Sequence, residues 1–158
     1  MRDGLQTGEL IRDAIEPYED TILRLQQEQL LSGKRSDGED IRPYYSEDLK
    51  PGGYFKTRDS AARYAAWKTT LSYPYEANRN ADAPNLYING KFHSELGVVF
   101  GSDAVTIAGT TPYAAGIVAK YGIDTFGLSE QSWAAVFEMG AFDNLLTNIR
   151  NIFEYGSE

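Results

Sequence analysis

His93 is the only histidine in this chain of 158 residues, and there is no cysteine. A catalytic triad takes its base from a histidine, and a zinc site takes most of its ligands from histidines and cysteines. The lack of cysteine also removes disulfides and cysteine nucleophiles. We therefore expect His93 to be an ordinary packed or surface residue.

Carboxylates are the next groups that could carry chemistry. The run Asp37-Gly38-Glu39-Asp40 places three acids within four residues. Calcium and magnesium prefer several oxygen ligands, but this run lacks the spacing of a calcium-binding loop, and we interpret it as a solvated turn. Pairs of catalytic carboxylates usually lie far apart in sequence, so spacing singles out no pair. A small metal-dependent hydrolase using dispersed carboxylates therefore stays an alternative.

Short motifs for nucleophilic or phosphate chemistry are absent. There is no Gly-x-Ser-x-Gly elbow. Gly101, Gly109, Gly116 and Gly122 are too far apart for a phosphate-binding loop, and no lysine-serine or lysine-threonine pair follows them. The sequence thus predicts that the chain is not an enzyme and that it has no cofactor and no metal.

Tyrosine is the residue type with an unusual distribution. Seven of the eleven tyrosines lie between residues 44 and 87. Tyrosine combines apolar area with a polar tip and is enriched at protein interfaces. We predict an interface composed of Tyr44, Tyr45, Tyr54, Arg58, Arg63, Tyr64, Trp67, Tyr73, Tyr75 and Tyr87. Two alternatives are that the tyrosines pack loops onto their own domain, or that they form a platform for single-stranded nucleic acid.

The charge of the chain is unevenly distributed. The net charge of −8 opposes general nucleic-acid binding, because affinity for phosphates comes mainly from lysine and arginine. Residues 50–91 nevertheless hold seven basic and three acidic side chains, a net charge of +4 that leaves −12 for the rest. Such polarity can pair one face of a subunit with a different face of its neighbour and so close a ring. A chance excess of solvated lysines is the alternative.

The elements that position these residues fit one domain over residues 1–158, with enough apolar residues for a core. Residues 1–10 are expected to form a flexible arm. No apolar run approaches the roughly 20 residues of a membrane span, and no signal peptide is recognisable, so we expect a soluble product that does not contact membranes.

An amphipathic helix is predicted near the amino terminus, because apolar residues recur there at helical spacing. Its stripe consists of Ile11, Ile15, Tyr18, Ile22 and Leu25. Pro17 either kinks this helix or lies in its first turn, with the helix beginning at Glu16. Gly33 is the expected end. Segments 36–55 and 72–84 are predicted as long loops. A short helix capped by Asp59-Ser60 is expected between them.

A small antiparallel sheet is predicted within Leu86 to Gly109. The runs 98–100 and 105–107 are short β-branched or aromatic segments separated by Gly101-Ser102-Asp103, which is typical of a hairpin. Carboxy-terminal helices follow: one from Thr110-Thr111-Pro112 to Gly122, and a last one that opens near Ser129 and bends at Gly140. The predicted fold class is α+β.

The order of these pieces resembles small phage morphogenesis proteins of the tail-completion or head-to-tail joining class. The similarity covers roughly residues 15–130. The stretch 123–129 is similar to the "Phe-Gly-Leu" stretch of related proteins from phages of gut Bacteroidetes. Besides the amino-terminal helix, the segments that carry the resemblance are Ile41-Arg42-Pro43-Tyr44-Tyr45, residues 86–94, the hairpin 98–107, Pro112-Tyr113-Ala114 and Lys120-Tyr121-Gly122.

This resemblance implies a structural virion subunit, assembled in the host cytoplasm, that forms or completes a ring at the phage neck or upper tail. Its partners would be copies of itself and other neck, portal or tail proteins, with no sequence-specific nucleic acid. We expect an acidic channel face, because a lumen that conducts DNA must not bind it. A monomeric adaptor or inhibitor that binds a host protein through its tyrosine loops is a further alternative.

Overall fold

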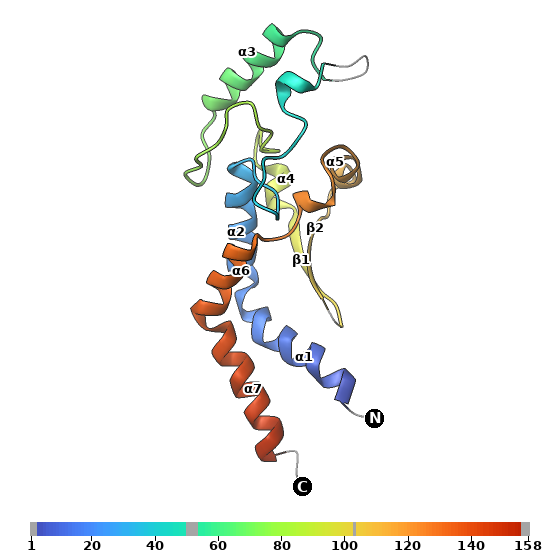
Figure 1. The fold of residues 1–158 in the computed structure, drawn as a ribbon, viewed down its shortest axis with the longest axis vertical. Helices are drawn as coiled ribbons and strands as arrows, with labels where there is room; N and C mark the ends of the chain where they lie inside the picture. The colour runs from blue at the N-terminus through green and yellow to red at the C-terminus, as the bar shows by residue number, and fades with distance from the viewer. Residues whose placement is uncertain (1–2, 50–53, 103, 156–158) are drawn as a thin grey trace.

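The computed structural model describes residues 3–49, 54–102 and 104–155. The molecule is elongated, with α3 and its neighbouring loops at one end and α1 and α7 at the other, where both termini lie (Figure 1). The described helices and strands confirm the predicted α+β class. The main elements are α1 (Asp3–Ile15), α2 (Glu19–Leu31), α3 (Arg58–Thr69), α4 (Lys91–Ser94), β1 (Leu96–Phe100), β2 (Val105–Gly109), α5 (Ala114–Tyr121), α6 (Glu130–Val136) and α7 (Phe142–Tyr155).

The amino-terminal stripe forms two helices joined at a bend. A short 3₁₀ turn, Glu16–Tyr18, contains Pro17 and separates α1 from α2, so the kink alternative holds. Proline cannot donate the hydrogen bond that a continuous helix requires there. In the segment 1–10, expected as a flexible arm, the residues from Asp3 onward form the first part of α1. Gly33 ends α2 with a φ of 67°, as predicted.

Helix α3 begins earlier than predicted. Its cap is Thr57, not the pair Asp59-Ser60. The Ser60 backbone N–H donates to the Thr57 hydroxyl, and the Thr57 backbone N–H donates to the Ser60 hydroxyl, both at 3.1 Å. Serine three residues after threonine therefore gives a reciprocal cap. The described parts of the predicted loops 36–55 and 72–84 contain one 3₁₀ turn, Tyr45–Glu47, and an isolated bridge from Asp40 to Lys34. Residues 50–53 of the first loop lie outside the described residues.

The predicted hairpin is confirmed. Strands β1 and β2 pair antiparallel with Val98 opposite Ile107, and the Gly101 N–H donates to the Ala104 carbonyl across the turn at 2.8 Å. Asp103, predicted in this turn, lies outside the described residues. The segment before Leu96 is not strand as expected, because α4 occupies Lys91–Ser94.

The carboxy-terminal helices follow the prediction. Helix α5 ends before Gly122, and Ser129 caps α6 by accepting from the Ser132 N–H at 3.2 Å. Gly140 has a φ of 133° inside the π turn Phe137–Ala141, which separates α6 from α7. The expected bend at Gly140 is thus confirmed. A Cβ atom there would lie 2.5 Å from the Tyr18 hydroxyl, so only glycine fits.

Two glutamines of α2 attach the 125–129 segment to the body. The Gln26 side chain is fully buried, accepts from the Gly127 N–H at 2.7 Å and donates to the Thr125 carbonyl. Gln29 accepts from the Ser129 N–H at 2.9 Å and donates to the Gly127 carbonyl at 2.8 Å. These amides therefore satisfy backbone groups that have no sheet partner there.

Apolar packing is divided into three clusters along the long axis. One centres on Ile22 and Val136, a second on Leu30 and Ile41, and a third joins α3 to Phe55. Among the described residues, no helix is long and apolar enough to cross a membrane.

Candidate interaction surface and aromatic pocket

The end of the molecule at α3 is built around a cluster of aromatic rings. We use "head cluster" for Tyr45, Tyr54, Phe55, Tyr64 and Trp67. Their rings meet mostly edge to face, with centroids 4.9 to 5.8 Å apart. Helix α3 can approach them closely because Ala61 and Ala65 lie on its inner face and are buried. Such contacts stabilise beyond the apolar area that they bury.

The rings of the head cluster differ in exposure: Tyr45 is buried, whereas Tyr54 and Trp67 are exposed. Tyr45 is only 7 % exposed, and burial raises the pKa of its hydroxyl. Tyr45, one of the predicted interface residues, therefore packs its ring inside the domain. Tyr54 and Trp67, by contrast, are 68 % and 43 % exposed.

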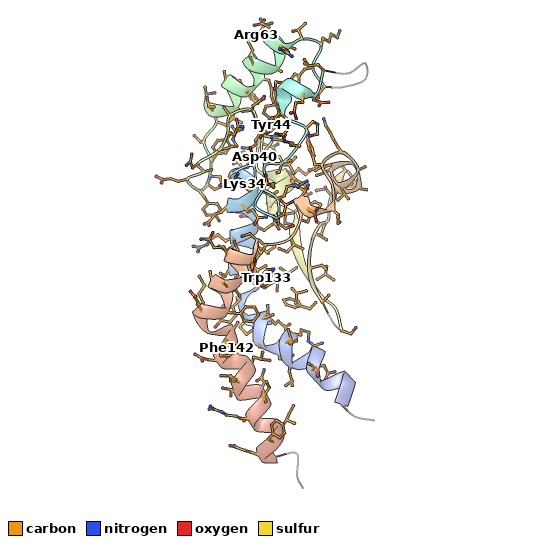
Figure 2. All side chains as sticks on the ribbon, viewed as in Figure 1. Lys34, Asp40, Tyr44, Arg63, Trp133 and Phe142 are labelled. Atoms are coloured by element: carbon orange, nitrogen blue, oxygen red, sulfur yellow. The ribbon has the colours of Figure 1, made fainter. Side chains whose placement is uncertain are left out.

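Two exposed arginines lie on the same helix as the exposed tryptophan. Arg58 and Arg63 are exposed, and Arg63 pairs with Asp59 one turn away at 2.9 Å. Arg63 lies at the extreme end of the molecule in Figure 2. Arginine beside exposed aromatic rings is typical of protein-binding surfaces. Four of the predicted interface residues, Tyr54, Arg58, Arg63 and Trp67, are thus close in sequence and accessible.

Tyr44 is part of a separate polar cluster. Its hydroxyl donates to Asp40 at 2.7 Å, and the Lys34 ammonium contacts the same carboxylate at 2.7 Å (Figure 2). The Arg42 guanidinium stacks over the Tyr44 ring at 4.1 Å. The hydrogen bond from Lys34, with that from Tyr44, lowers the pKa of Asp40. The Tyr44 side chain therefore makes its contacts within its own loop, with Asp40 and Arg42.

The aspartates of the acidic run 37–40 bind partners within the chain. Asp40 binds Lys34, and Asp37 binds Arg35 while it accepts from the Glu39 N–H at 3.0 Å. These contacts agree with the interpretation as a solvated turn. Within the described ranges, no group of three histidine, aspartate or glutamate side chains could hold a metal ion.

Tyr73, Tyr75 and Tyr87 are partly buried beside the loop 72–84. Tyr73 donates its hydroxyl to the Lys68 carbonyl and packs its ring 5.2 Å from that of Tyr87. Tyr87 in turn packs 5.2 Å from His93. These contacts match the alternative in which tyrosines pack loops onto their own domain.

A cavity of about 370 Å³ opens between the head cluster and α5. We call it the aromatic pocket. Five tyrosines line it together with Lys68, Asn89 and apolar residues, and no acid does. The five are Tyr45, Tyr64, Tyr87, Tyr113 and Tyr121. Its size and apolar lining with a few polar groups are typical of small-molecule sites.

Lys68 is the functional candidate that the sequence analysis missed. It was counted among the cations of segment 50–91, but it is only 1 % exposed. Its ammonium donates to the Tyr87 carbonyl, and none of the ion pairs in the described chain includes it. Burial, with the nearby charge of Arg79, lowers the pKa of Lys68 to about 8. Spacing from Ala61 and Ala65 was the available signal, because it places Lys68 on their buried face.

His93 is a packed histidine, as predicted. It is 3 % exposed, its Nε2 lies 3.0 Å from the Asn85 carbonyl, and burial lowers its pKa. Within the described chain, Nδ1 of His93 and Nδ2 of Asn85 have no hydrogen-bond partner.

Apolar side chains are also exposed in the half of the molecule opposite α3, on the π turn Phe137–Ala141 and on α7. Met139, Phe142 and Leu146 are 52 %, 54 % and 36 % exposed, and Phe142 lies where α7 begins (Figure 2). A cavity of about 400 Å³ lies between α7 and α1 and is lined by Leu10 and Ile149, among others. The apolar stripe of α7 could be predicted from the sequence. Its exposure could not, because it depends on how much of the stripe α1 covers.

The described geometry gives two exposed apolar ends and one apolar pocket that contains a buried cation. No protein-family model, curated protein or solved structure matches the chain.

Proposed function

We propose that this chain is a non-enzymatic structural subunit that assembles with copies of itself and with other components of a tailed phage particle. It forms or completes a ring at the neck or upper tail, as the resemblance to tail-completion and head-to-tail joining proteins implies. Its place would be the virion, after assembly in the host cytoplasm.

The observation that carries the assembly role is the large accessible surface of the single chain. It measures 10035 Å², whereas a compact monomer of 17.6 kDa exposes about 7,900 Å². The excess is about a quarter, and it exceeds the roughly 800 Å² that each partner contributes to a standard interface. A chain that buries so little of itself is well suited to contacts with neighbours.

The positions of the exposed apolar side chains support the same proposal. Tyr54 and Trp67 lie at the end formed by α3, whereas Phe142 and Leu146 lie in the first part of α7, the helix that runs to the opposite end (Figure 1). Contiguous exposed apolar groups mark interaction sites more often than free surface. Two different exposed apolar surfaces allow a head-to-tail contact between subunits. Repeated contacts of this kind close into a ring when the rotation between subunits permits.

Cross-linking tests this head-to-tail contact. A zero-length reagent that joins amines to carboxylates is applied to an equal mixture of unlabelled and ¹⁵N-labelled full-length protein. We expect mixed-isotope links between Lys56, in the segment before α3, and Asp143 or Glu154 on α7. Because α7 lies far from the α3 end within one copy (Figure 1), a zero-length link between them must join two copies.

Trp67→Ser tests the contribution of the α3 end, because it removes a ring that is 43 % exposed and packs on Tyr64 at 5.4 Å. It should reduce the mixed-isotope links. If the labelled and unlabelled chains link only within themselves over about a hundredfold range of protein concentration, the assembly proposal is wrong.

A further inference from the structure

The aromatic pocket contains a charge that the fold itself does not neutralise. Lys68 is almost fully buried, and the nearby charge that acts on it is the cation Arg79. A buried ammonium without a countercharge is costly, because it loses its hydration without an ionic partner. Asp48, an acid near the pocket tyrosine Tyr121, already binds Lys120 at 2.6 Å.

The ammonium of Lys68 also has unused donors. An ammonium carries three N–H groups. In the described chain one of them is accounted for, by the Tyr87 carbonyl. Tyr87 also lines the pocket. Its carbonyl therefore keeps the Lys68 ammonium beside the cavity.

The rest of the wall is suited to an apolar body. Phe92, Ile117 and Leu86 supply hydrocarbon, and the tyrosine rings supply flat faces. Tyrosine hydroxyls and the Asn89 amide are neutral and can donate to an oxygen. A ligand that matches both features has an apolar body and a negative end.

We propose that the aromatic pocket binds a small carboxylate with an aromatic or branched aliphatic body, with Lys68 as the partner of the carboxylate. This site goes beyond the assembly role and does not rest on it. The carboxylate supplies the countercharge that the fold lacks, and the apolar body covers the tyrosine faces.

Calorimetric titration of the full-length protein with three matched probes tests the site. Phenylacetate carries the required charge, phenylacetamide is its neutral analogue, and phenethylamine carries the opposite charge. We expect phenylacetate to bind about tenfold tighter than phenylacetamide, as befits one hydrogen bond to a charged group, and phenethylamine not to bind. Equal affinity for phenylacetate and phenylacetamide, or no binding of phenylacetate at millimolar concentration, would overturn the proposal.

Two lysine variants locate the effect. Lys68→Met keeps the length of the side chain and removes the charge, so it should abolish the preference for phenylacetate over phenylacetamide. Lys56→Met removes an exposed lysine from the same segment and should leave the preference unchanged. Should Lys68→Met fail to fold, the ratio of the two affinities in the unmodified protein still decides the question.

Light scattering during the phenylacetate titration separates two sources of the carboxylate. A free small molecule binds without changing the mass of the particle. If the acidic end of α7 from another copy fills the pocket, through Glu154, phenylacetate should instead dissociate an oligomer. Both results support carboxylate binding at the pocket, and only the first leaves assembly independent of it.

Discussion

At the scale of single residues, Lys68 is a buried cation whose pKa is lowered to about 8 by burial and by the charge of Arg79. Replacing it with methionine keeps apolar contacts and removes a buried charge. We expect Lys68→Met to raise the free energy of unfolding at pH 7 by about 1–2 kcal/mol, measured by urea denaturation. A loss of stability would mean that the hydrogen bond to the Tyr87 carbonyl outweighs the cost of burying the ammonium.

The same residue predicts a pH dependence with a defined sign. The pKa of Lys68 is lowered to about 8 in the folded chain from 10.5. Between these values the unfolded chain binds more protons than the folded one, so stability should rise from pH 8 to pH 10. Burial raises the pKa of Tyr45, which opposes this trend only above pH 10. Denaturation at a series of pH values should show the rise in the unmodified protein and a flatter curve in Lys68→Met.

Replacing Gln26 should lower the free energy of unfolding, because its side chain binds buried backbone groups. Gln26→Ala leaves the Gly127 N–H and the Thr125 carbonyl without their partner in a buried place. We expect a loss of about 2 kcal/mol in urea denaturation. Gln131→Ala is the control, because Gln131 is exposed on α6 and should change stability little. Equal effects of the two variants would refute the role given to Gln26.

At the scale of elements, the bend between α6 and α7 depends on Gly140. Alanine there meets both a φ of 133° and the Tyr18 hydroxyl. We expect Gly140→Ala to destabilise by about 2–3 kcal/mol. Gly116→Ala is the matched control within α5, where an added Cβ meets nothing within 4 Å.

The control should move in the opposite direction. Alanine favours a helix over glycine, so Gly116→Ala should stabilise by up to about 1 kcal/mol. Thermal denaturation of the two variants measures both shifts. If Gly140→Ala is as stable as the unmodified protein, α6 and α7 form a straighter helix than the structure describes.

The elements with strong local signals were predictable from sequence. The hairpin at 96–109, the end of α5 at Gly122 and the bend at Gly140 each have β-branched runs or glycines that fix the backbone. The cap of α3 was misplaced because Thr57 and Asp59 are both acceptable caps in sequence, and the reciprocal contact with Ser60 decides between them.

The candidate site was less predictable because it depends on contacts between distant segments. The sequence singled out the tyrosines, but whether each ring is exposed depends on the loops that cover it. Tyr45 is buried by α3, and Tyr73 by its contacts with Lys68 and Tyr87. The burial of Lys68 likewise depends on the loop 84–89, whose apolar residues have no helical or strand spacing.

At the scale of the whole molecule, the elongated shape separates a cationic segment from a mostly acidic remainder. A ring built from head-to-tail contacts would use this polarity, so higher salt should weaken association, as screening shortens the reach of charges to about 3 Å at 1 M. In an assembled ring we expect aspartate and glutamate side chains to line the lumen. A lumen lined by Lys56, Arg58 and Arg63 would contradict this arrangement.

The most direct test of the assembly role is sedimentation velocity of the full-length protein over a range of concentrations. We predict a single discrete oligomer that is lost in Trp67→Ser, on α3, and in Phe142→Ser, on α7. Val99→Ser should keep the oligomer, because Val99 is an exposed apolar residue on β1 and belongs to neither of these helices. A monomer at every concentration, or an oligomer that none of these substitutions changes, would contradict the account.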